Sequence, residues 1–103
     1  MTKEHISEPA AARWALLHGY VLYKRCASDG VVERACYALV DPRFEPEPHV
    51  SQPHVFMERC YFLTNGQSHI AFVSYITIET LEWAVKEMMI QPFNTAGFVE
   101  VSP

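Results

Sequence analysis

The chain has 103 residues, of which 50% are hydrophobic and 19% are charged, and its formal charge at pH 7 is −4. This composition is that of a globular protein, and it excludes a disordered chain. Apart from the adjacent Lys24 and Arg25, Lys and Arg are scattered singly, which argues against direct binding to nucleic acid. Because no apolar run approaches the roughly 18 residues that cross a bilayer, and the first residues lack the order of a secretory signal, we expect a cytoplasmic protein without membrane contact.

A helix is expected to begin after Ser7, whose hydroxyl can accept a hydrogen bond from a first-turn amide. Pro9 is tolerated in that turn, and Gly19 is a typical residue just beyond a helix end. Between Ala10 and Leu17 only Arg13 is polar, so apolar surface surrounds most of this helix. Such a helix needs cover on more than one side, and a second subunit or another protein would supply it.

An alternative needs no partner, because alanines expose little apolar area and scattered exposed apolar residues are normal. In this alternative the large side chains of the helix face the core and the small or charged ones face solvent. The inward residues would then be Trp14, Leu16 and Leu17, and the outward ones Ala11, Ala12 and Arg13.

A first β-hairpin is predicted from 20–27 and 31–40, joined by a turn at Asp29 and Gly30. A two-residue loop places Arg25 opposite Arg34, whereas a three-residue loop places it opposite Glu33. Charge pairing does not choose between these registers.

The three cysteines of the chain have no CxxC spacing, and their odd number suits a reducing compartment with buried thiols. They are Cys26, Cys36 and Cys60. A disulfide between Cys26 and Cys36 is not expected, because no tight hairpin register places them opposite each other.

Residues 41–54 hold four of the seven prolines and show no periodicity, which predicts a stiff connection. It is either a functional loop that embraces a partner or a crossover over a sheet edge. His49 and His54 lie there near Glu45 and Glu47, but their spacing matches no usual metal site, so we expect no metal.

A second hairpin is predicted from 55–63 and 68–77 around Asn65 and Gly66. Counting from a two-residue loop places Val55 opposite Ile76. Both faces of this hairpin are mainly apolar, so we expect it to be central and covered on both sides, by helices or by another subunit.

A second helix is expected after Thr77 and through Ile90, with Pro92 preventing its continuation. Its core stripe consists of Leu81, Ala84, Val85 and Met88. Trp83 and Ile90 lie off this stripe, and a short last strand is predicted at 98–101.

These elements predict one α+β domain over residues 1–103, with a Pro-rich connection at 41–54. It consists of an N-terminal helix, an antiparallel sheet of four to five strands from two hairpins, a second helix packed on the sheet, and a short C-terminal strand.

The predicted register brings Glu58, Cys60 and His69 to one face, where a thiol, an imidazole and a carboxylate could meet. A small enzyme or ligand-binding domain using these residues is therefore one hypothesis. Aromatic and aliphatic neighbours make Cys60 more typical of a core residue, and the sequence has no nucleotide, hydrolase or metalloprotease motif. We expect no catalytic, cofactor or metal site.

The preferred hypothesis is a small non-enzymatic interaction module, itself a homodimer, that binds and blocks another protein. An example is an antiactivator that prevents a transcription regulator from self-associating. Aromatic and Arg anchors dominate such interfaces. The expected protein-binding residues are Arg13, Trp14, Leu16, Leu17 and Trp83.

Overall fold

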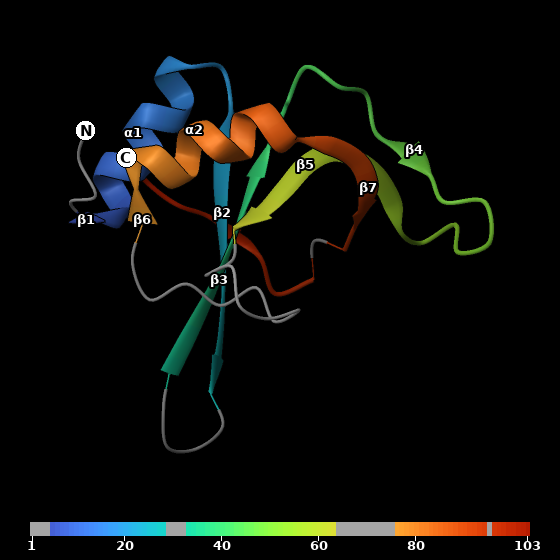
Figure 1. Ribbon diagram of the computed structural model, residues 1–103. Coiled ribbons are helices and arrows are strands. Elements are labelled where there is room, and N and C mark those ends of the chain that lie inside the picture. Colours follow the sequence, from blue (N-terminus) through green and yellow to red (C-terminus); the bar gives the residue numbers. More distant parts are fainter. Residues whose placement is uncertain (1–4, 29–32, 64–75, 95) are drawn as a thin grey trace.

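The computed structural model describes residues 5–28, 33–63, 76–94 and 96–103. It shows the predicted α+β fold, with two helices and antiparallel sheets (Figure 1). The elements in chain order are β1 (His5–Ile6), α1 (Glu8–Leu17), β2 (Val21–Ser28), β3 (Glu33–Val40), β4 (Glu47–Pro48), β5 (Phe56–Leu63), β6 (Ile76–Thr77), α2 (Ile78–Glu87), β7 (Met89–Phe93) and β8 (Val99–Glu100).

The described strands form a six-stranded sheet and a separate two-stranded sheet of β1 and β6, and all their pairings are antiparallel. The large sheet has the order β4-β5-β3-β2-β8. Cys60 pairs with both Val40 of β3 and Met89 of β7, so β7 lies along the other edge of β5. The predicted C-terminal strand is present as β8. The strands outnumber the predicted four to five, because short segments at β1, β4 and β7 also pair.

The first hairpin forms, but with neither predicted register. Arg25 lies opposite Cys36, rather than opposite Arg34 or Glu33, and the connecting residues 29–32 lie outside the described part of the chain. Cys26 pairs with Ala35, so the two cysteines are not opposite each other, as expected.

The second predicted hairpin pairing is wrong where it can be compared. Ile76 pairs with Ile6 of β1 instead of with Val55, and the neighbours of β5 are β3, β4 and β7. The predicted turn at Asn65 and Gly66 and most of the second strand fall in residues 64–75, which are outside the described residues.

Helix α1 begins and ends as predicted. The Ser7 hydroxyl accepts a hydrogen bond from the Ala10 amide at 3.2 Å, which satisfies a first-turn donor. At the other end Gly19 has φ 87°, a left-handed conformation that costs glycine little, and its amide donates to Leu16.

Helix α2 begins as predicted and ends earlier. Thr77 and Thr80 form a reciprocal capping box at its start. The helix stops at Glu87, and the chain continues as β7, in which Pro92 lies opposite Met57. In the described part of the chain β7 pairs only with β5, and an edge strand accepts proline because it needs no amide donor on its open side.

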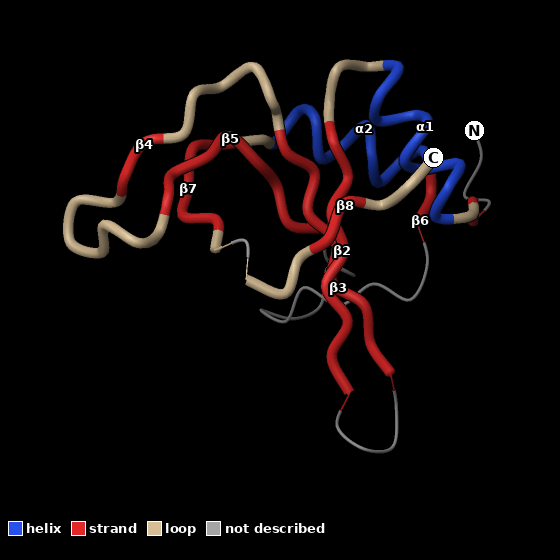
Figure 2. Tube along the Cα trace, turned by 180° about the vertical axis from the view of Figure 1, so that it is seen from behind, coloured by secondary structure: helices blue, strands red, loops and turns tan. Residues whose placement is uncertain are grey.

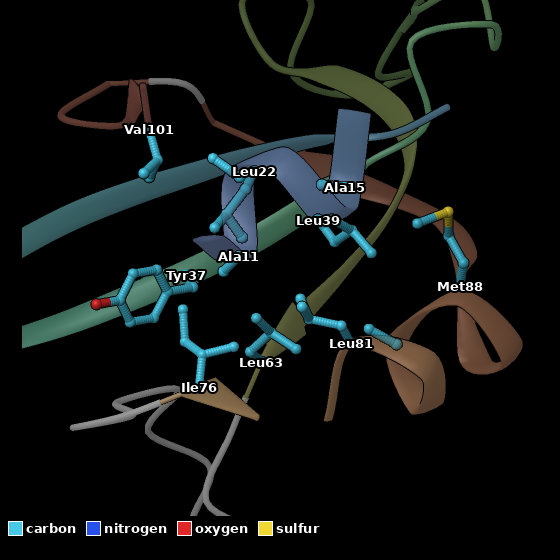
Figure 3. Packing of buried hydrophobic residues seen from close by; sticks show 12 residues of the cluster. Ala11, Ala15, Leu22, Tyr37, Leu39, Leu63, Ile76, Leu81, Met88 and Val101 are labelled. Atoms are coloured by element: carbon cyan, nitrogen blue, oxygen red, sulfur yellow. The ribbon is translucent and has the colours of Figure 1, made fainter. Parts of the chain in front are cut away.

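The hydrophobic core lies on both faces of the large sheet. On one face, residues of α1 and α2 pack against side chains of the strands (Figure 3). This cluster consists of Ala11, Ala12, Ala15, Leu22, Tyr37, Leu39, Leu63, Ile76, Leu81, Ala84, Met88 and Val101, and it includes three residues of the predicted α2 stripe. The cross-strand partners Leu22 and Leu39 show that these side chains share one face.

The other face of the sheet carries a smaller, aromatic cluster. Phe93 of β7 packs there on the buried residues Ala38, Val40 and Cys60, with Phe98 at a ring-centroid distance of 5.0 Å from Phe93. Strand β5 thus contributes to the core on both faces, as its doubly apolar pattern predicted.

Helix α1 packs against the core through its alanines. Ala11 and Ala15 are completely buried, whereas Leu17 is 84% exposed. The predicted alternative, with the leucines inward and the alanines outward, is therefore wrong. Short side chains let the helix backbone approach the sheet closely, and no larger residue fits between them.

Replacing Ala15 by Leu is expected to lower the free energy of unfolding by about 1–3 kcal/mol, because the larger side chain overfills a packed site. Replacing Leu17 by Ala should change it by less than about 0.5 kcal/mol. Urea unfolding curves of the two variants measure both values. A larger loss in Leu17→Ala than in Ala15→Leu would mean that the helix packs the other way round.

Candidate protein-binding surface

The outer face of α1 is the apolar side of the helix that points away from the core. We define it by Arg13, Leu16 and Leu17, all exposed, with 47% of Leu16 and 84% of Leu17 accessible. Arg13 and Leu17 are four residues apart and so lie one above the other on the helix. The structure therefore brings three of the five predicted binding residues to one exposed surface.

The predicted binding residue Trp14 lies at the edge of this face. It is partly buried against the core, and its ring stacks on that of His18 with centroids 3.9 Å apart. A ring nitrogen of His18 is 2.7 Å from the Trp14 carbonyl oxygen. Trp14 thus contacts both the core and His18 at the end of its own helix.

Trp83, the fifth predicted residue, is on the outer side of the neighbouring helix α2. It is 55% exposed, while Leu81 and Ala84 on the inner side are buried. Glu79 is exposed one turn before Trp83, and Lys86 and Glu87 are exposed one turn after it. We call Glu79, Trp83 and Glu87 the outer face of α2.

The two outer faces belong to one layer of the molecule. α1 and α2 contact each other and pack on the same face of the sheet. Figures 1 and 2 show them together at one side of the molecule, with β4 at the other. Both outer faces consequently point away from the sheet.

The start of α1 is fixed to the sheet by a carboxylate. Glu8 pairs with the Lys24 ammonium at 2.7 Å and accepts a hydrogen bond from the Tyr37 hydroxyl. Burial alone would raise the pKa of Glu8, but these two partners lower it below its ordinary value. The negative charge also suits the positive end of the helix.

The chain just after α1 is fixed by a second carboxylate, which the sequence analysis did not single out. Asp41 is 2.9 Å from Arg43 and 2.8 Å from Arg59, and the Arg43 guanidinium lies 5.1 Å above the Tyr20 ring. Gly19 is close by, since a Cβ built there would come within 3.5 Å of Arg43. The charged residues Asp41, Arg43 and Arg59 can be read from the sequence. The proximity of Arg59 to Asp41, however, depends on the pairing of β3 with β5.

Burial alone would raise the pKa of Asp41, but hydrogen bonds from Arg43 and then from Arg59 lower it below its ordinary value. A lowered carboxylate pKa stabilises the folded chain at all pH values above the unfolded pKa, about 3.9. This stabilisation is lost as the pH falls through the lower, folded pKa.

Replacing Asp41 by Asn is therefore expected to lower the free energy of unfolding at pH 7 by about 1–2 kcal/mol, since the arginines are partly exposed and screened. The variant should also lose less stability than the native chain below about pH 4. Denaturant unfolding at a series of pH values measures both effects. Glu8 keeps part of the acid sensitivity in the variant, and an unchanged pH profile would contradict a role for Asp41.

Two of the three hypothetical catalytic residues, Glu58 and Cys60, lie on the aromatic face of the sheet. Cys60 is completely buried there, and burial, followed by the charge of Glu58, raises the pKa of its thiol to about 12. Burial also raises the pKa of Glu58. The third residue, His69, is outside the described residues. A thiol that stays protonated at neutral pH has the opposite of the activation that a cysteine nucleophile needs.

Alkylation with iodoacetamide tests this assignment. In the folded protein at about pH 8, Cys60 should remain unmodified, because its thiolate is suppressed and buried. After unfolding in denaturant it should react fully, which serves as the internal control. Peptide mapping by mass spectrometry follows Cys60 separately from the other cysteines, and rapid labelling in the folded state would contradict the assignment.

Two residues of the Pro-rich connection, Glu47 and Pro48, form β4 and pair with β5. His49 accepts a hydrogen bond from the Ser51 amide at its ring Nδ1, 3.1 Å away. Within residues 5–28, 33–63, 76–94 and 96–103, no group of three or more His, Cys, Asp or Glu side chains is arranged to hold a metal ion.

Comparison of the chain with protein-family models, with curated proteins and with solved structures finds no match. Neither of the described helices, each of ten residues, is long and apolar enough to span a membrane.

Proposed function

We propose that this protein is a non-enzymatic interaction module that binds another protein through the outer face of α1, assisted by Trp83. The observation that carries the proposal is the orientation of α1. Its alanines are buried and its leucines are exposed, so that Leu17 contributes little to the core of its own chain.

The proposed binding mode is that of a helix lying in a groove. Arg13 and Leu17 are spaced i, i+4, and Leu16 widens the apolar surface, which is the arrangement of anchors in helix-in-groove complexes. Complete burial of a leucine side chain stabilises a complex by about 1.5–3 kcal/mol before the costs of association. Arg13 adds a long, polar rim contact, and the ring of Trp14, stacked on His18, borders the face.

The target we propose is a cytoplasmic transcription regulator whose self-association surface offers such a groove. Occupying that groove prevents the regulator from assembling, which makes the protein an antiactivator. The chain itself is proposed to be a homodimer, because the same exposed apolar side chains also favour self-association. The buried thiols Cys36 and Cys60 are compatible with a reducing compartment.

The alternative, an enzyme or ligand-binding domain using Cys60, His69 and Glu58, gains no support from the described residues. The burial that raises the pKa of Cys60 favours a structural thiol.

Capture from a cytosolic extract tests the proposal. The tagged protein is used at high dilution, and proteins bound to it are identified by mass spectrometry. Replacing both Leu16 and Leu17 by Ser should reduce recovery of a specific target at least about tenfold, because two buried leucines would be lost. Replacing the fully exposed Val50 by Ser removes an apolar side chain elsewhere and should leave recovery unchanged.

Two results would overturn the proposal: equal recovery with the native and the double-Ser protein, or an equal loss with the Val50 variant. For a captured regulator, sedimentation then measures whether added native protein, but not the double-Ser variant, lowers its oligomeric state. A regulator that stays oligomeric in the complex would contradict the antiactivator mechanism.

A further inference from the structure

The outer faces of the two helices differ in chemistry and complement each other. The α1 face is apolar with one cation, Arg13, and none of the ion pairs found among the described residues involves it. The α2 face carries an exposed aromatic ring, Trp83, between the carboxylates of Glu79 and Glu87. The exposed ammonium of Lys86 lies beside this face, but the exposed carboxylates of α2, with Glu82 included, outnumber it three to one. A guanidinium fits both carboxylates and the face of an indole ring.

We propose that the occupant of this helix layer, in the absence of a target, is a second copy of the chain, with α1 of each copy packed on α2 of the other. Because α1 and α2 lie next to each other in one layer, a two-fold axis between the copies forms this contact twice. Each copy then pairs Arg13 with the partner's acidic residues and buries Leu17 against the partner's tryptophan.

The length of the two helices limits the contact area of this dimer and therefore its affinity. Each has ten residues and is about 15 Å long, so the contact lies at the small end of protein interfaces. We expect a dissociation constant in the micromolar range.

Under the proposed function, on which this step rests, self-association and target binding compete for one surface. Self-association covers Leu16 and Leu17, so the dimer and the complex with a target exclude each other. The dimer is then a storage form whose apolar side chains are protected, and dissociation exposes the binding face.

Charge reversal tests the interface on the purified full chain by sedimentation equilibrium. Arg13→Glu should raise the dimer dissociation constant at least about tenfold, and so should Glu79→Arg combined with Glu87→Arg. When all three substitutions are in one chain, the charges are complementary again. This triple variant should return the dissociation constant to within about threefold of the native value, because both contacts of the two-fold pair are restored.

The matched control is Glu45→Arg combined with Glu47→Arg, which changes the net charge by the same amount. These exposed residues lie in the Pro-rich connection and β4, away from the helices (Figure 1), so the dimer should be unaffected. Circular dichroism verifies that every variant is folded, as expected for substitutions at exposed positions.

Three outcomes would overturn the inference. They are a native protein that stays monomeric up to the millimolar range, a dimer that is indifferent to charge reversal, and a folded triple variant that does not re-form it. Because no target is present in these measurements, their failure is separate from a failure of the capture experiment, which uses protein too dilute to dimerise.

Discussion

The close packing of the alanine side of α1 against the sheet is the constraint on which the functional account depends. Ala11, Ala12 and Ala15 are buried and let the helix approach the strands closely. Leu17 follows Ala15 by two residues, a rotation of roughly 200° around the helix, so it points outward. Glu8 at the start of the helix and the Asp41 cluster after its end hold it in this orientation.

The fold class, both helices and their caps could be predicted from the sequence because the signals are local. Ser7, Gly19 and Thr77 act through hydrogen bonds within a few residues, and the α2 stripe follows from helical periodicity. The pairing partners of the strands were harder to predict, because strand pairing depends on contacts between residues distant in sequence. Ile76 pairs with Ile6, seventy positions away, and Pro92 lies in an edge strand that no local pattern predicts.

The candidate surface was predictable in its residues but not in its geometry. The apolar circumference of α1 identified Leu16 and Leu17, yet size alone favoured placing them inside. When small residues form a contiguous side of a helix, that side can pack against the sheet instead of the large residues. The close approach then buries more of the helix backbone and more of the neighbouring strands. The carboxylates around Trp83 indicate a surface complementary to Arg13 only when α1 and α2 are known to lie in one layer.

Solvent accessibility of the leucine methyl groups tests the central claim most directly, by NMR with a soluble paramagnetic probe. In dilute, monomeric protein the methyl groups of Leu17 should be broadened strongly and those of Leu39 and Leu81 should not, because Leu17 is exposed whereas Leu39 and Leu81 are buried. Addition of the captured target should protect Leu17. Leu17 methyl groups that are already shielded in the monomer, or that stay accessible in the complex, would contradict the account.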